Sequence, residues 1–195
     1  MNKIDKEAYK HCLHTAKTNG HINFYNYLSN TEIISAKKNY DISFSLREFL
    51  IKTVIGQQIS ISAAKSIWNK VSTIINKKEL NENDLAACGV SKMKQKYIMG
   101  IHFFLNKNSF DKKELQKLDE NELNTIFLPL KGIGPWSIKI MQMFYLENTD
   151  VWLPEDLAIK RGLNLFFHDE NANGIQSLYS PYRTYFCLYL WSSLN

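Results

Sequence analysis

Apolar residues recur every three or four positions along most of the chain, which is the spacing that places them on one face of an α-helix. The pattern is clearest in residues 49–54, 64–75 and 98–105. No stretch alternates apolar and polar residues as a half-buried strand does, and polar segments such as 81–84 separate the apolar faces. Because the mean helix has roughly 11 to 12 residues, we expect an all-α fold of about eight to ten short helices.

Length and composition bound the size of this fold. With 195 residues, 45% of them hydrophobic and 13% aromatic, the chain can build one compact domain or two small lobes. The longest clear apolar run, Phe186–Trp191, is too short to span a bilayer. The first fifteen residues carry charges where a signal peptide has an apolar segment, so we expect a cytoplasmic protein without a membrane partner.

Charge points to polyanionic partners. Lys and Arg number 24 against 19 Asp and Glu, which gives a net charge of +5. Lysines cluster at Lys37–Lys38, at Lys77–Lys78, and at Lys92, Lys94 and Lys96, among other places. Such runs are typical both of nucleic-acid contacts and of solvated helix faces, and the sequence leaves both interpretations open.

A glycine-rich turn lies in residues 128–139. Gly132 and Gly134 are separated by one residue, and a helical pattern follows Pro135. A tight turn of this kind points backbone amides the same way at the positive end of a helix, where they can bind a phosphate. An ordinary connection between two helices has the same pattern.

A helix start is expected within residues 150–161. Pro154 is followed by Glu155 and Asp156, and carboxylates at this place cap a helix and are stabilised by its dipole. Simple capping therefore accounts for both acids unless other residues give one of them a further role.

Two amides interrupt an apolar helix within residues 54–64. Gly56 precedes Gln57 and Gln58, and the next helix begins near Ser62. Paired glutamines at a helix junction can reach into a groove or fill a gap in stacked bases, or they can simply face solvent.

Taken together, these segments resemble one family, the helix-hairpin-helix (HhH-GPD) DNA glycosylases of the 3-methyladenine DNA glycosylase II branch. The matching motifs are Gly-Gln-Gln-Ile-Ser at 56–60, Leu-Lys-Gly-Ile-Gly-Pro-Trp-Ser at 130–137, Leu-Pro-Glu-Asp at 153–156, Ala-Ile-Lys-Arg at 158–161, and Ser-Pro-Tyr-Arg-Thr-Tyr at 180–185 running into Leu190 and Trp191. They occur in the family's order over roughly 44–191.

The resemblance implies two helical lobes with a DNA-binding cleft. About residues 1–43 and 152–195 would form one lobe, and about 44–151 would form the bundle that carries the hairpin. Some members also have a β-rich domain of about a hundred residues, and we expect it to be absent because about 43 residues precede Phe44.

The resemblance also assigns a DNA-binding hairpin. The matching positions are Lys131, Gly132, Ile133, Gly134 and Ser137. Hairpins of this family commonly bind a monovalent cation, Na⁺ or K⁺, which here would fall to the backbone carbonyls of Leu128, Leu130 and Ile133.

The family's catalytic aspartate aligns with Asp156, and its pocket aromatics align with Trp136 and Trp191. The loop that enters the duplex where the damaged base has left aligns with Gln57 and Gln58. Either glutamine could be the inserted residue.

The implied activity is hydrolysis of the N-glycosidic bond of alkylated purines, 3-methyladenine and 7-methylguanine, after base flipping from double-stranded DNA. Trp136 stands where bifunctional relatives carry a Schiff-base lysine, so we expect a monofunctional enzyme that leaves an abasic site.

No cofactor is expected to be required. Some relatives bind an iron–sulfur cluster with four cysteines near the C-terminus, where this sequence has only Cys187, so no cluster is expected. The family suggests a monomer. A glycosylase for hypoxanthine or ethenoadenine, and a non-catalytic protein that binds damaged DNA, are the alternatives.

Overall fold

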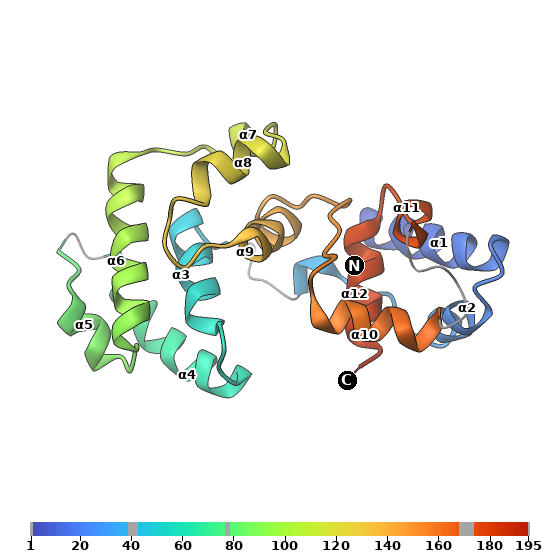
Figure 1. Ribbon diagram of the computed structural model, residues 1–195, viewed down its shortest axis with the longest axis horizontal. Coiled ribbons are helices and arrows are strands. Elements are labelled where there is room, and N and C mark those ends of the chain that lie inside the picture. The colour runs from blue at the N-terminus through green and yellow to red at the C-terminus, as the bar shows by residue number, and fades with distance from the viewer. Residues whose placement is uncertain (1, 39–42, 77–78, 168–173, 195) are drawn as a thin grey trace. The chain divides into compact units, whose positions relative to one another are not determined.

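The structure is a computed structural model that describes residues 2–38, 43–76, 79–167 and 174–194. The basic pair Lys77–Lys78 lies outside this range. Within it the chain forms twelve α-helices and no β-strand, so the all-α prediction is confirmed (Figure 1). The helices outnumber the expectation because some, such as α7 (Lys112–Leu115), have four residues and are too short to show an apolar period.

Contacts among the helices divide the chain into two units. One contains both ends of the chain, Met1–Ile42 and Gln142–Asn195, and the other contains Ser43–Met141. We expected the second boundary after residue 151, but residues 142–151 belong to the terminal unit. The Thr184 hydroxyl donates to Asn148 O at 2.7 Å, and Asp150 pairs with Arg183 at 2.7 Å, which ties this segment to the last helix.

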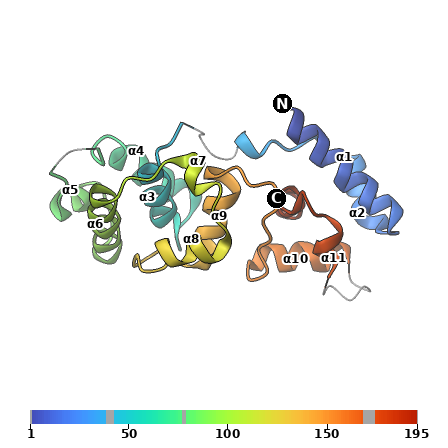
Figure 2. The same cartoon turned by 90° about the horizontal axis from the view of Figure 1, so that it is seen from above.

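The middle unit is built around α3 (Leu46–Gly56) and α6 (Lys92–Lys107), which pack on each other (Figure 2). Their shared interior includes the buried side chains of Phe49, Val54 and Ile98. The unit is completed by α4 (Ile61–Val71), α5 (Glu82–Ala87), α7, α8 (Glu120–Phe127) and α9 (Pro135–Ile140).

The terminal unit places its first two helices beside its last. Helix α1 (Lys3–Thr18) packs on α2 (Ile22–Ser29) and on α12 (Arg183–Ser192), which in turn packs on α10 (Leu157–Phe166) and α11 (Ile175–Leu178). Its core is aromatic, since the rings of Tyr179 and Phe186 stack with centroids 3.9 Å apart and Phe24 meets both edge-on. Two shorter turns, η1 (Ala36–Lys38) and a π-helical turn (Met141–Tyr145), complete the described helical structure.

None of the described helices is both long and apolar enough to cross a lipid bilayer.

Candidate active site

Asp156 is the N-cap of α10, as the Pro-Glu-Asp motif predicts. Its Oδ1 accepts hydrogen bonds from the backbone N–H groups of Ala158 at 2.9 Å and Ile159 at 3.0 Å. These are donors that the first turn of a helix cannot satisfy by itself, and they lie at its positive end. Asp156 is half-buried, and its negative charge is stabilised by the positive end of the helix.

Trp191 lies against the same carboxylate. Its indole N–H donates to Asp156 Oδ1 at 3.1 Å, although the two residues are 35 positions apart. Oδ1 therefore receives three donors, two from the backbone and one from a side chain, which restricts how the carboxylate can turn. Capping the helix would need only the two backbone donors. The third donor, from Trp191, fixes the orientation of the carboxylate further, as expected for a group with a chemical role.

The Trp191 ring also packs on Phe144, with the ring planes 17° apart and the centroids 6.5 Å apart. The sequence indicated Trp191 through the family motif, but it gave Phe144 no role beyond an apolar helix position. A near-parallel aromatic neighbour holds the indole at the angle from which its N–H meets Asp156.

Gly162 allows α10 and α12 to approach closely. A Cβ atom at position 162 would lie 2.9 Å from Leu190 Cβ and 3.0 Å from Leu190 O. Because Trp191 follows Leu190 on α12, the close packing of these helices helps to bring the indole to the N-terminus of α10. The sequence pattern did not single out Gly162, since a glycine inside a helical pattern does not show what it faces.

The segment before Asp156 is held by an ion pair. Arg183 Nε lies 2.7 Å from Asp150 Oδ1, Arg183 Nη2 lies 2.9 Å from Oδ2, and Ser180 Oγ donates to Oδ2 at 2.9 Å. Partial burial works to raise the pKa of Asp150, but the hydrogen bonds from Arg183 and Ser180 outweigh it and the pKa is lowered. Arg183 therefore has a structural role.

The predicted hairpin lies in the middle unit between α8 and α9. Gly134 is the N-cap of α9 and Pro135 is its first residue. Gly132 has a φ of 89°, and a Cβ there would lie 2.5 Å from the Tyr97 ring, so both its backbone conformation and its packing require glycine. Lys131 is exposed beside it.

The remaining hairpin residues differ in what they offer a ligand. Ser137 is buried, with 2% of its surface exposed, so neither its hydroxyl nor its backbone is open to solvent. Trp136, the second residue of α9, is 42% exposed.

One of the three carbonyls expected to bind a cation accepts a hydrogen bond within the turn. Leu130 O accepts from Ile133 N at 3.0 Å, which leaves the second lone pair of that carbonyl available to an ion. In the described part of the chain, no group of three or more His, Cys, Asp or Glu side chains could hold a metal ion.

The two glutamines of the interrupted helix differ. Gln57 turns its amide inward, where Nε2 donates to Gly132 O at 2.9 Å and lies 3.4 Å from Ser137 Oγ. Gln58 is exposed and has a φ of 56°, in the left-handed region. Both line a groove of about 530 Å³ that also includes Tyr97 and the hairpin glycines.

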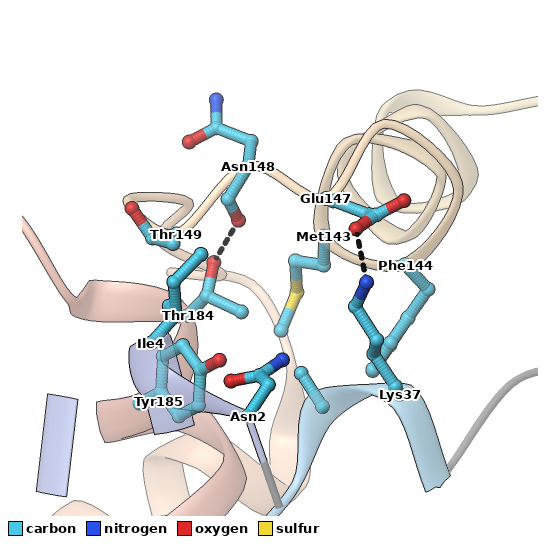
Figure 3. A pocket seen from close by; sticks show the side chains of 11 residues that line it. Asn2, Ile4, Lys37, Met143, Phe144, Glu147, Asn148, Thr149, Thr184 and Tyr185 are labelled. Atoms are coloured by element: carbon cyan, nitrogen blue, oxygen red, sulfur yellow. Dashed lines mark hydrogen bonds and ion pairs between the residues drawn. The ribbon is translucent and has the colours of Figure 1, made fainter. Parts of the chain in front are cut away.

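A small pocket of about 60 Å³ lies in the terminal unit (Figure 3). It is lined by Met143, Phe144 and Tyr185 among others, and the ion pair between Lys37 and Glu147 lies at its edge at 2.9 Å. Neither Asp156 nor Trp191 lines it, but Phe144, whose ring packs on Trp191, does.

Solved structures define the class of fold. The chain superimposes on the 3-methyladenine DNA glycosylase of Schizosaccharomyces pombe, solved in complex with abasic DNA, with a TM-score of 0.72 and 22% identity over 96% of both chains. The DNA-3-methyladenine glycosidase of Bacillus halodurans gives a TM-score of 0.71 at 21% identity, covering 92% of this chain and 86% of that chain. This likeness establishes the helix-hairpin-helix DNA glycosylase fold.

Sequence comparison narrows the class. The DNA-3-methyladenine glycosylase of Saccharomyces cerevisiae is 30% identical over 165 residues, which cover 73% of this chain and 55% of that protein. The alkylbase DNA glycosidase-like protein of Schizosaccharomyces pombe is 30% identical over 161 residues, which cover 74% of this chain and 76% of that protein. No protein-family model matches the chain.

The chain belongs to the 3-methyladenine DNA glycosylase family, and the resemblance carried by its motifs is confirmed. It spans little more than half the length of the Saccharomyces cerevisiae relative.

Proposed function

We propose that this chain is a monofunctional DNA glycosylase that removes alkylated purines, chiefly 3-methyladenine and 7-methylguanine, from double-stranded DNA. The observation that carries the proposal is the Asp156 carboxylate, held by three hydrogen-bond donors in a chain of the 3-methyladenine DNA glycosylase family. A protein that only bound damaged DNA would not need a carboxylate oriented in this way.

The chemistry suits a single carboxylate. A purine alkylated at N3 or N7 carries positive charge, so the N-glycosidic bond breaks with its electron pair passing to the base, which leaves neutral. The sugar becomes an oxocarbenium ion, and water then adds to C1′ and loses a proton. Asp156 stabilises the positive charge that develops on the sugar and receives or directs the proton of the attacking water.

The expected contribution of Asp156 is large. A unit charge about 4 Å from the sugar at an effective dielectric near 20 contributes about 4 kcal/mol, which is nearly three decades of rate. Trp191 orients that charge through its N–H, and its ring offers the aromatic surface that a cationic base prefers. Trp136, the other aromatic that the family motifs assign to the pocket, presents part of its ring to solvent on α9.

The middle unit supplies the DNA contacts. The amides of the hairpin at Gly132 and Gly134 bind phosphate oxygens, and a monovalent cation on the carbonyls of Leu128, Leu130 and Ile133 adds positive charge there. Gln58, exposed at the tip of its loop, is the residue that enters the duplex, whereas Gln57 is engaged with the hairpin. The chain acts as a monomer.

The test is base release from methylated duplex DNA. Freed purines are identified by chromatography, and strand breaks are measured before and after alkali. The wild type is expected to release 3-methyladenine, with breaks that form only after alkali because no lyase step follows. Asp156→Asn, which keeps an acceptor for the same donors, is expected to bind abasic-site DNA normally and to lose about a thousandfold in excision rate.

Trp191→Phe is the second variant in this experiment, and its effect should be smaller than that of Asp156→Asn. It keeps an aromatic ring against Phe144 but removes the N–H that reaches Asp156, so excision should fall about tenfold with DNA binding retained. Equal turnover by Asp156→Asn and wild type would disprove the assigned role. Release of only hypoxanthine or ethenoadenine from DNA that carries them would change the substrate, and tight damage binding without any release would indicate a binding protein.

A further inference from the structure

Lys94 makes contacts that differ from those of a DNA-binding lysine. It lies in the first turn of α6, and its ammonium Nζ donates to two backbone carbonyls, Ile55 O at 2.7 Å and Gln57 O at 2.6 Å. Both carbonyls lie at the C-terminal end of α3, the negative end of that helix. A cation there satisfies acceptors that have no partner within the helix.

Gln57 continues this chain of contacts. Its backbone carbonyl is bound by Lys94, and its side-chain Nε2 donates to Gly132 O at 2.9 Å. Helix α6, the end of α3 and the glycine hairpin are therefore connected through one residue.

The loop that these contacts hold is short. Gln57 is the C-cap of α3 and Ser60 is the N-cap of α4, its hydroxyl accepting from Ala63 N at 3.2 Å. Gln58, directly beside the held residue, has a φ of 56°, a conformation that a glutamine adopts only when its surroundings require it. The contacts of Gln57 provide that constraint.

The lysines on either side of Lys94 provide the comparison. Lys92 and Lys96 are exposed, whereas Lys94 is half-buried. Burial also lowers the pKa of Lys94, as expected for an ammonium that has left part of its water shell. Lys94 therefore has a different environment from the two lysines beside it, although the sequence does not distinguish them.

From this geometry, and resting on the proposed function, we infer that Lys94 and Gln57 are positioning residues. They hold the Gln58 loop and the glycine hairpin together as one preorganised DNA-contacting face. Lys94 acts on DNA through the loop and makes no phosphate contact of its own. Its replacement should therefore impair the recognition of a gap in the duplex and leave the general electrostatic attraction to DNA unchanged.

The decisive measurement is how binding depends on salt. A lysine that neutralises a phosphate contributes about 0.9 to the slope of log K against log salt concentration, and a lysine that binds carbonyls contributes nothing. Binding of the full chain would be measured over a salt series to two duplexes, one intact and one with a tetrahydrofuran abasic site opposite 2-aminopurine. The variants are Lys94→Met and its control Lys96→Met, which removes the same charge from an exposed position on the same helix.

Lys94→Met should keep the wild-type salt slope while its preference for the abasic duplex falls about tenfold and the 2-aminopurine signal of loop insertion weakens. Lys96→Met should keep the preference, whatever its slope. Lys94→Arg, which retains a cation that can donate to both carbonyls, should recover part of the preference. A slope reduced by about 0.9 in Lys94→Met with an intact preference would overturn the inference, because it would make Lys94 a phosphate contact.

A measurement without DNA separates this inference from the proposed function. Amide hydrogen exchange of residues 57–60 should become about tenfold faster in Lys94→Met than in wild type and stay unchanged in Lys96→Met. Unchanged exchange in Lys94→Met would refute the positioning role even if the enzyme activity is confirmed.

A wild type that binds the intact and the abasic duplex equally well would refute the proposed function. The hydrogen-exchange result would then decide whether Lys94 positions the loop. If Lys94→Met does not fold, Gln57→Met breaks the contact with Gly132 and should show the same loss of preference.

Discussion

The two candidate functional regions of this protein are constructed in opposite ways. Around Asp156 the functional group is a side chain, and it is held by a helix N-terminus and by Trp191. Around the hairpin the proposed functional groups are backbone amides, and the side chains of Tyr97 and Gln57 both contact Gly132. Removing the functional group by mutation is therefore simple in the first region, whereas the second can be tested only through its supports.

The difference between the two regions is also seen in the reasons why each contains a glycine. Gly132 in the hairpin has a positive φ and also lies against Tyr97. Gly162 in α10 has ordinary helical geometry and is required only because Leu190 is so near. One glycine shapes the backbone of the hairpin that we propose contacts DNA, and the other sets the distance between two helices.

The largest effect is expected from Gly132→Ala. The added methyl group would lie 2.5 Å from Tyr97 Cδ2 in a backbone conformation that L-residues rarely adopt. Together the strain and the overlap should lower the free energy of unfolding by about 2 to 5 kcal/mol and weaken DNA binding. Urea denaturation and binding to an abasic duplex measure the two effects.

Gly134→Ala is the control for this prediction. Gly134 has a φ of −110°, and a Cβ there meets nothing within 4 Å, so its stability should change by less than about 1 kcal/mol. The double variant Gly132→Ala with Tyr97→Ala relieves the overlap but not the strain, so the two changes should show favourable coupling. Strict additivity would mean that the Tyr97 contact does not constrain the hairpin.

A smaller effect is expected from Gly162→Ala in the carboxylate region. The methyl group would meet Leu190 Cβ at 2.9 Å and Leu190 O at 3.0 Å, and neither atom is the end of a flexible side chain. Helices α10 and α12 must separate, which should cost about 1 to 3 kcal/mol of stability and reduce excision because Trp191 moves away from Asp156. Thermal unfolding and the excision rate measure these losses.

Gly100→Ala makes the same chemical change as Gly162→Ala but should raise the free energy of unfolding instead of lowering it. Gly100 lies within α6 and is exposed, and a methyl group added there would meet nothing within 4 Å. Alanine should therefore stabilise the protein by about 0.5 to 1 kcal/mol, because it lowers the conformational entropy of the unfolded chain and favours the helix. If both variants are stabilised, the close approach of α10 and α12 is not a constraint.

The sequence predicted local features well. The helix start at Asp156 and the turn at Gly132 and Gly134 follow from residue types within a few positions, because capping and positive φ depend on neighbours in the chain. The family motifs then singled out Asp156 from Glu155, which capping chemistry alone could not do.

Contacts between residues that are far apart in the chain could not be predicted from the sequence. The bond from Trp191 to Asp156 and the approach of Leu190 to Gly162 depend on how α10 and α12 pack, which apolar periodicity does not specify. Gln57 and Gln58 are identical neighbours in the sequence, and only the structure shows that Gln57 donates to Gly132 O while Gln58 has a positive φ.

The smallest effect is expected from the ion pair that precedes Asp156. The pKa of Asp150 is lowered in the folded protein, so the pair stabilises the fold above the unfolded value of about 3.9 and this stabilisation is lost as the pH falls through the folded value. Because both side chains are partly exposed, Asp150→Asn should cost about 1 kcal/mol at pH 6. The difference between wild type and variant should begin to shrink as the pH falls below about 4, where the unfolded chain takes up the proton, and should disappear below the lowered pKa of folded Asp150.

The helices on either side of the hairpin have an ion pair for comparison, between Lys139 of α9 and Glu120 of α8 at 2.8 Å, with 19% of the Lys139 side chain and 49% of the Glu120 side chain exposed. Glu120→Gln should change stability by less than about 0.5 kcal/mol at either pH, since exposed pairs contribute little. Urea denaturation of both variants at pH 6 and pH 3.5 provides the test. A pH-dependent loss in Glu120→Gln as large as that in Asp150→Asn would show that charges support the hairpin as strongly as the carboxylate region, and the contrast between a backbone-built and a side-chain-built region would fail.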